Sequence, residues 1–243
     1  MPTTRLSFAI AAIFACSAFA QTGKVIYLTH VETPQDLQEV TNVVRSIAEI
    51  RDVTPDQTKM SITVHGTADQ NALAQWLCGE MDRAAPQPAG TQQYTVPHSD
   101  VPAVQVFFLA QMNTPQFLQE AVNAVRSVAD IQRFFPYNAR HAIVARGTAE
   151  QVALAAWLVQ LLDQPSGQPV NEYRVTGDRN PIVSLVYLAE NQPPQSVQEM
   201  VSAVRTETQM QRIFGSTVCH AVAMRGTADQ VSRAGELIKA LTK

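Results

Sequence analysis

Gly147-Thr148-Ala149-Glu150-Gln151 is the stretch that decides the fold, because the chain contains it three times. It occurs earlier as Gly66-Thr67-Ala68-Asp69-Gln70 and later as Gly226-Thr227-Ala228-Asp229-Gln230. In each copy the glycine suits a turn, the threonine suits a helix N-cap, and the glutamine three residues later completes a capping box. Each copy therefore predicts a strand that turns into a capped helix.

The similarity continues on both sides of this stretch. Residues 24–82, 105–163 and 184–242 align without a gap over 59 positions. About 26 positions are identical between the first two copies and about 24 between the last two. The mature chain is therefore one unit repeated three times.

Within each copy the pattern reads as strand, helix, strand, strand, helix. The first strand is β-branched and aromatic, and the first helix opens at a Thr-Pro pair, as in Thr33-Pro34. Short second strands are expected near Val53, Phe134 and Ile213. We predict an α+β fold of three tandem βαββα units, each a small three-stranded sheet with two helices on one face.

The predicted organisation follows from the repeats and the segments between them. It comprises a signal peptide at 1–20, repeat units at 21–82, 105–163 and 184–243, and linkers at 83–104 and 164–183. The linkers are rich in Pro, Gly, Gln and Ser, as domain boundaries often are. Each contains a β-like fragment, around Tyr94 and Tyr173, that we expect can add an edge strand to a neighbouring sheet.

The N-terminus has the features of an export signal. Arg5 precedes an apolar stretch that ends at Ala15, and Ala18-Phe19-Ala20 fits the small-x-small cleavage rule. We expect cleavage before Gln21, a periplasmic or secreted location, and no membrane span after cleavage. Acylation at Cys16 is the alternative.

Composition narrows the class of function. Of 243 residues, 46% are hydrophobic and 16% are charged, which is enough apolar material for folded cores. The net charge of −3 lacks the basic excess of a nucleic-acid binder, so we expect no nucleic-acid partner.

The unit resembles the short periplasmic N-domains of secretins, the outer-membrane channels of secretion and pilus machines. The matching residues are Ile143-Val144-Ala145-Arg146-Gly147-Thr148 with the helix end at 158–163, and Met224-Arg225-Gly226-Thr227 with 237–241. The resemblance covers all three units and not the channel-forming domain. It implies domains that pack edge to edge or into rings in the periplasm.

The sequence predicts no catalytic residue, no metal ligand and no cofactor. The five histidines lack metal-site spacing, and His141 and His220 occupy a place that Met60 takes in the first copy. Cys78 is expected in a core, and Cys219 is expected to face away from its own core, so we predict no disulfide between them. The repeated Arg45, Arg126 and Arg205 are expected to be solvated, salt-bridged or in contact with the next unit or a partner.

Two groups of apolar residues form the candidate interaction surface. The first strand is apolar on both faces although helices cover only one, so its second face is expected to pack on a linker, a neighbouring unit or a partner. The second helix carries an extra apolar stripe in copies one and two, which Arg233 and Glu236 replace in copy three, as in a capping repeat. The residues are Val25, Tyr27, Val106, Phe108, Leu185, Tyr187, Leu73, Trp76, Leu154 and Trp157.

We therefore expect a non-enzymatic, exported interaction or scaffold protein of the periplasm or cell envelope, with a protein partner or self-association. The resemblance implies association with a secretin-type secretion assembly. One alternative is a soluble peptide- or ligand-binding protein that uses an open sheet edge. The other is an enzyme with a site between units.

Overall fold

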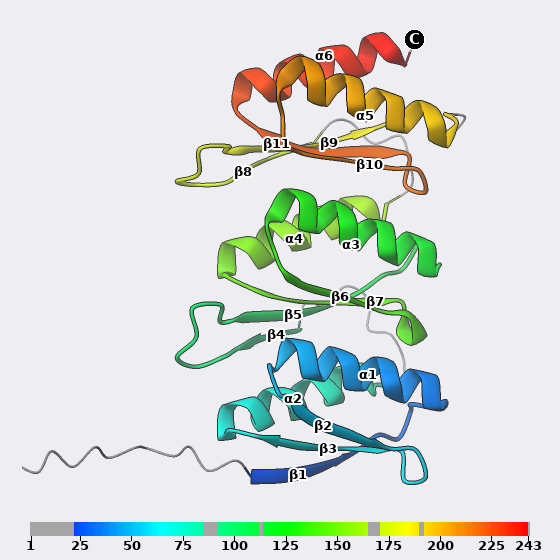
Figure 1. The fold of residues 1–243 in the computed structure, drawn as a ribbon, viewed down its shortest axis with the longest axis vertical. Coiled ribbons are helices and arrows are strands. Elements are labelled where there is room, and N and C mark those ends of the chain that lie inside the picture. Colours follow the sequence, from blue (N-terminus) through cyan, green and yellow to red (C-terminus); the bar gives the residue numbers. More distant parts are fainter. Residues whose placement is uncertain (1–21, 85–91, 112–113, 165–170, 190–191, 243) are drawn as a thin grey trace, which may run out of the picture.

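The computed structural model describes residues 22–84, 92–111, 114–164, 171–189 and 192–242. The predicted signal peptide and Cys16 lie outside the described residues. Three α+β units follow one another along a single stack, which Figure 1 shows from the first unit at the bottom to the third at the top. The predicted fold class is confirmed.

The elements alternate as the repeats predict. The first unit contains β1 (Thr22–Tyr27), α1 (Pro34–Ile47), β2 (Asp52–Asp56), β3 (Ser61–Gly66) and α2 (Ala68–Met81). The second contains β4 (Gln92–Thr95), β5 (Ala103–Phe108), α3 (Pro115–Ala129), β6 (Arg133–Tyr137), the 3-10 turn η1 (Asn138–Arg140), β7 (Ala142–Gly147) and α4 (Ala149–Leu162). The third contains β8 (Asn171–Arg174), β9 (Ile182–Tyr187), α5 (Pro194–Thr208), β10 (Arg212–Ser216), β11 (Ala221–Gly226) and α6 (Ala228–Leu241).

The threonine of each recurring stretch is an N-cap. Thr67, Thr148 and Thr227 each accept a hydrogen bond from the backbone N–H of the glutamine three residues on, whose side chain bonds back to the threonine N–H. Such caps satisfy amides that a helix N-terminus otherwise leaves without partners, which typically stabilises a helix by about 1 kcal/mol. The same local rule therefore starts the second helix of every unit.

The sheets differ in strand number. The first has three antiparallel strands in the order β1-β3-β2, whereas the second and third have four, β4-β5-β7-β6 and β8-β9-β11-β10. Three strands were expected in each unit. The extra strands β4 and β8 lie in the predicted linkers, and each pairs with the first strand of the unit that follows it.

The units stack sheet on helices (Figure 1). Two helices cover the upper face of each sheet, and the lower face of the second and third sheets rests on the helices of the preceding unit. The core beneath α1 and α2 is therefore continuous with the lower face of the next sheet, through Val106, Ala142 and Val144. The core of the second unit extends in the same way to Leu185 and Ala223. Burial of apolar side chains across both junctions stabilises the stack as well as each unit.

Candidate interaction surfaces

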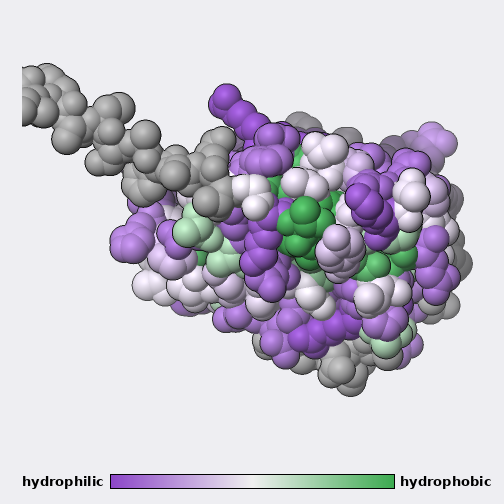
Figure 2. All heavy atoms as spheres, turned by 90° about the horizontal axis from the view of Figure 1, so that it is seen from below, coloured by the Kyte–Doolittle hydropathy of each residue, from purple (hydrophilic) through white to green (hydrophobic). Residues whose placement is uncertain are grey.

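In the described part of the chain, the lower face of the first sheet is the apolar strand surface that no other unit covers. Val25 is 49% exposed and Tyr27 is 65% exposed, and both lie on β1. Figure 2 looks at this end and shows a small apolar cluster surrounded by polar side chains. The exposed pair is a place where another chain can bury apolar surface.

The equivalent side chains of the other two units are covered by a neighbouring unit. Val106 and Phe108 on β5 and Leu185 on β9 are buried. Tyr187 is half-buried, and its hydroxyl donates a 2.6 Å hydrogen bond to the carbonyl of Leu161 at the end of α4. Burial also raises the pKa of Tyr187 above its ordinary value. The same strand face is therefore exposed in the first unit and covered in the other two, depending on the position of the unit in the stack.

The first sheet also carries polar residues where the second sheet is apolar. Thr54 and Asp56 on β2 replace Phe135 and Tyr137 of β6, and Tyr137 is fully buried. On the same strand, the carboxylate of Asp52 lies 3.0 Å from the imidazole of His65. The lower end therefore combines two exposed apolar side chains with a polar surround, a composition typical of interaction surfaces rather than of a repeat interior.

The second-helix stripe of copies one and two packs against the strand that follows it. Leu73 and Leu154 are buried. The Trp76 ring packs against Tyr94 of β4, with centroids 5.3 Å apart and planes tilted by 41°. The Trp157 ring packs against Tyr173 of β8 in the same way, at 5.5 Å and 48°. Each half-buried indole thus holds the added edge strand of the next unit against the helix below it.

The upper end of the stack is polar at the same positions. Arg233 and Glu236 on α6 are exposed, and Arg233 pairs with Glu207 of α5 at 3.4 Å. Glu207 stands where Ile47 and Val128 are buried in the lower units. The third unit therefore ends the array with a charged surface, as terminal repeats do.

A glutamate on the first helix joins each unit to the next. The Glu39 carboxylate accepts hydrogen bonds from the backbone N–H and side-chain amide of Asn138 at 2.9 and 3.2 Å. The Glu120 carboxylate accepts from the hydroxyls of Ser216 and Thr217 at 2.5 and 3.0 Å and from a backbone N–H at 3.1 Å. Both carboxylates therefore hold the turn between the last two strands of the sheet above.

The electrostatics of Glu120 reflect this arrangement. Partial burial opposes ionisation, but the hydrogen bonds from Ser216, Val218 and Thr217 outweigh it and lower the pKa of Glu120. Glu199 has the same place on α5 and is exposed. The charge is retained at the top of the stack, where the described residues contain no sheet above it.

A buried arginine makes a second connection at each junction. Arg146 at the end of β7 donates to the carbonyls of Ile47 and Val101 at 2.5 and 3.2 Å. Arg225 on β11 donates to the carbonyls of Val128 and Asn180 at 2.9 and 3.0 Å. In each case the guanidinium links the end of the helix below to the loop that follows the added strand. The pKa of both guanidinium groups is lowered by burial, and both are surrounded by acceptors.

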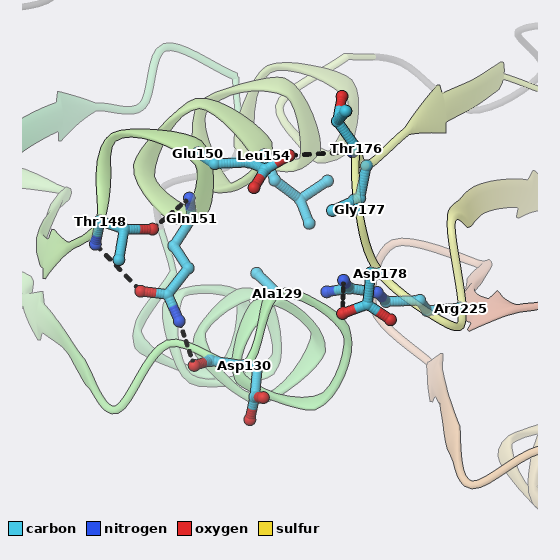
Figure 3. A pocket seen from close by; sticks show the side chains of 11 residues that line it. Ala129, Asp130, Thr148, Glu150, Gln151, Leu154, Thr176, Gly177, Asp178 and Arg225 are labelled. Carbon is cyan, nitrogen blue, oxygen red and sulfur yellow. Dashed lines mark hydrogen bonds and ion pairs between the residues drawn. The ribbon is translucent and has the colours of Figure 1, made fainter.

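The junction between the second and third units contains a cavity of about 290 Å³ beside this arginine (Figure 3). The polar groups that line it bond to one another. Gln151 donates to the Asp130 carbonyl at 2.7 Å, Thr176 N–H donates to Glu150 at 3.0 Å, and Arg225 pairs with Asp178 at 2.8 Å. Of these, the Thr176–Glu150 bond attaches the β8–β9 loop to the unit below, whereas the other two contacts lie within one unit. None of the three pairs a nucleophile with a base.

The cysteines and repeated arginines have local roles. Cys78 and Cys219 are free and buried, and burial raises the pKa of each thiol to about 12. Arg45, Arg126 and Arg205 each donate to a backbone carbonyl eight residues on, in the second strand of the same unit. They tie helix to strand within a unit, a role that differs from the surface or inter-unit contacts expected for them.

The described residues contain neither a candidate metal site nor a candidate membrane-spanning helix. No three His, Cys, Asp or Glu side chains there come together in a way that could hold a metal ion. None of the described helices combines the length and apolar character needed to cross a membrane.

No protein-family model and no curated protein matches the chain, but several solved structures do. Several of the solved structures that it resembles are of secretins or of their N-terminal domains. The N-terminal domain of the secretin XcpQ from Pseudomonas aeruginosa is 11% identical, with 91% of this chain and 100% of that chain covered and a TM-score of 0.28. ExeD of Aeromonas hydrophila is 13% identical over 92% of this chain and 41% of its own, with a TM-score of 0.22.

The secretin GspD of E. coli K12 is 8% identical over 93% of this chain and 39% of its own, also with a TM-score of 0.22. The chain thus spans about two fifths of the length of ExeD and GspD. The resemblance to secretin N-domains noted in the sequence is therefore found among solved structures too. It is a likeness of fold, and with TM-scores this low it carries no argument about function.

Proposed function

We propose that this protein is a non-enzymatic interaction or scaffold protein that is exported to the periplasm or cell envelope. One observation carries the proposal: Val25 and Tyr27 are exposed on a strand face that is covered in both other units. Buried arginines, glutamates and aromatic pairs join each unit to the next. Val25 and Tyr27 take part in no such junction and lie exposed at the lower end of the stack.

The scaffold role follows from the junctions. Each joins two units by a continuous apolar core, a buried arginine, a glutamate and a Trp–Tyr pair, so the three units act as one spacer. The lower end offers apolar surface to a partner, whereas the upper end is charged. This difference between the two ends suits a protein that binds a partner at its lower end and holds that partner at a fixed distance from whatever lies at its upper end.

An enzyme with a site between units is the less favoured function. The grooves at the junctions are the place for it, but their polar side chains are used in bonds that hold the added strand and its loop. Arg146 and Arg225 illustrate this, because each guanidinium already bonds to two backbone carbonyls. Association with a secretin-type assembly rests on the sequence resemblance and belongs to the same proposal.

Site-specific photo-crosslinking in living cells tests the interaction role. A photoreactive residue placed at Tyr27 is expected to capture an envelope protein or a second copy of the chain, and the same residue at the exposed Glu236 serves as the matched control. Equal capture from both positions, or none from position 27, would contradict the proposal. N-terminal sequencing of the protein recovered from the envelope tests export, with Gln21 expected as the first residue.

A further inference from the structure

The free edge of β1 is the place where the first unit differs most from the other two. In the second and third sheets the strand that opens the unit is internal, because β4 pairs with β5 and β8 pairs with β9. In the first sheet, β1 pairs with β3 on one side, and the described part of the chain places no strand on the other. The backbone groups along that edge are a template for a further strand.

The two internal precedents define the register of such a strand. Val25 of β1 corresponds to Val106 and Leu185, which lie opposite Gln92 and Asn171. By the same equivalence, Lys24 corresponds to Gln105 and Ser184. The residues opposite those two positions are Gln93 and Glu172. An added antiparallel strand in this register therefore places its central residue opposite Lys24.

Lys24 gives this position a charge that the other sheets lack. Its ammonium group bonds to the side-chain oxygen of Gln75 on α2, so it is held near the edge of the sheet and half-buried. Opposite charges facing each other across paired strands stabilise the pair, and like charges destabilise it. The central residue of the added strand is therefore best acidic.

The neighbouring position favours an aromatic residue. Gly23 of β1 corresponds to Val104 and Val183, which lie opposite Tyr94 and Tyr173. Glycine has no side chain there, and the ring of His65 lies in the space that a Cβ would occupy, with its Nε2 2.8 Å from that position. An aromatic side chain across from an edge glycine covers it, and here it extends the exposed apolar surface of Val25 and Tyr27.

We propose that the edge of β1 binds an extended, antiparallel segment of a partner protein, with an acidic residue opposite Lys24 and an aromatic residue opposite Gly23. The chain itself supplies an example of this pattern, because Glu172 and Tyr173 of β8 stand at the two corresponding positions. The proposal rests on the proposed function, since it names the kind of segment that the lower end of the scaffold receives.

A peptide with the sequence of residues 170–176 (Val-Asn-Glu-Tyr-Arg-Val-Thr) is the probe. Titrated into the full chain, it is expected to bind saturably, with amide shifts concentrated on 22–27 in NMR spectra. Lys24→Glu is expected to weaken binding about tenfold, because attraction across the strands becomes repulsion. A peptide with Lys in place of Glu172 is expected to lose affinity for the wild-type chain and to regain it with Lys24→Glu.

Two further variants keep the experiment decisive. Lys24→Gln retains a polar group of similar reach, so an unchanged melting temperature in this variant separates loss of charge from loss of fold. A chain in which residues 170–181 are grafted directly before Thr22 fills the edge with its own hairpin and is expected to bind no peptide. Absence of saturable binding to the wild-type chain overturns the proposal, as does binding that neither Lys24→Glu nor the graft changes. Crosslinking from Tyr27 would remain informative in that case, so the two proposals fail separately.

Discussion

The carboxylate of Glu120 accepts a 2.5 Å hydrogen bond from the hydroxyl of Ser216, and this bond joins a helix of one unit to the sheet of the next. The same glutamate occurs in all three units but is exposed in the last. Glu199, the exposed equivalent, is therefore an internal control for the contribution of the Glu120 contact to stability.

Glu120→Gln is expected to lower the free energy of unfolding by about 1–2 kcal/mol, because a charge-assisted set of hydrogen bonds becomes neutral. Chemical denaturation measures the loss, and hydrogen exchange at 216–218 locates it. Glu199→Gln is the matched control and is expected to change stability by less than about 0.5 kcal/mol. Equal effects of the two variants would show that the junction contact is not the cause.

The lowered pKa of Glu120 predicts a dependence on pH. A carboxyl group whose pKa is lower in the folded state contributes stability above its unfolded pKa of about 4.3, and this contribution is lost as the pH falls through the folded value. The urea midpoint is therefore expected to fall with pH below about 4.3 less steeply in Glu120→Gln than in the wild-type chain. An identical slope in both proteins would assign the acid sensitivity to other groups.

Trp157→Ala removes the ring that packs against Tyr173. We expect a loss of about 2–3 kcal/mol, less than for a fully buried tryptophan, and faster cleavage within 164–183 in limited proteolysis. Glu236→Ala at the equivalent position of the third unit is the control. If the second unit loses stability while cleavage within 164–183 stays at the wild-type rate, the indole supports its own unit alone.

Arg225→Met leaves the carbonyls of Val128 and Asn180 without their buried donor, at a cost of about 2–4 kcal/mol. Arg174→Met, at an exposed position on β8, should be nearly neutral. Thermal unfolding of the two variants side by side gives the comparison. A melting temperature for Arg225→Met within error of wild type would show that water replaces the guanidinium without cost.

Gln209 ends α5 in the left-handed region, with φ of 55°, and makes no bond to another unit in the described chain. Gln209→Gly is expected to stabilise the protein by about 0.5–1 kcal/mol, because glycine enters this region without steric cost. Asp130 has φ of 57° at the equivalent position but pairs with Arg212 of the next unit at 3.0 Å. Asp130→Gly should therefore gain less, and denaturation midpoints of both variants test the difference.

The repeats allowed the fold class, the capping boxes and the second strands to be predicted, because each depends on local pattern. The apolar pairs of the first strands also indicated that their lower face needs a cover. The element that covers this face was not predictable. An apolar sheet face has the same sequence pattern whether it packs on the helices of another unit or on a partner protein. Residues such as Tyr137, which the first copy replaces with Asp56, carry that information only when the copies are compared position by position.

The junction polar groups were missed for a related reason. A glutamate on an amphipathic helix and an arginine at a strand end read as solvated residues, and their burial depends on a unit that lies far along the chain. The glutamate is retained in all three copies, so it gave no signal. The available signal was the loss of the arginine in one end copy and, in the other, of the acidic residue that pairs with an arginine of the next unit. His65 replaces the arginine in the first copy, where the described residues have no unit below, and Gln209 replaces Glu49 and Asp130 in the last.

The stacking direction has a mechanical consequence. The described chain starts at Thr22 at the bottom of the stack and ends at Thr242 at the top (Figure 1), so tension between the two ends acts across both junctions. The strands of each sheet run across that direction, and therefore the Glu120–Ser216 and Arg225–Val128 contacts lie between the pulled units. Stretching beyond what the junction contacts withstand is expected to part whole units in discrete steps while their sheets stay intact.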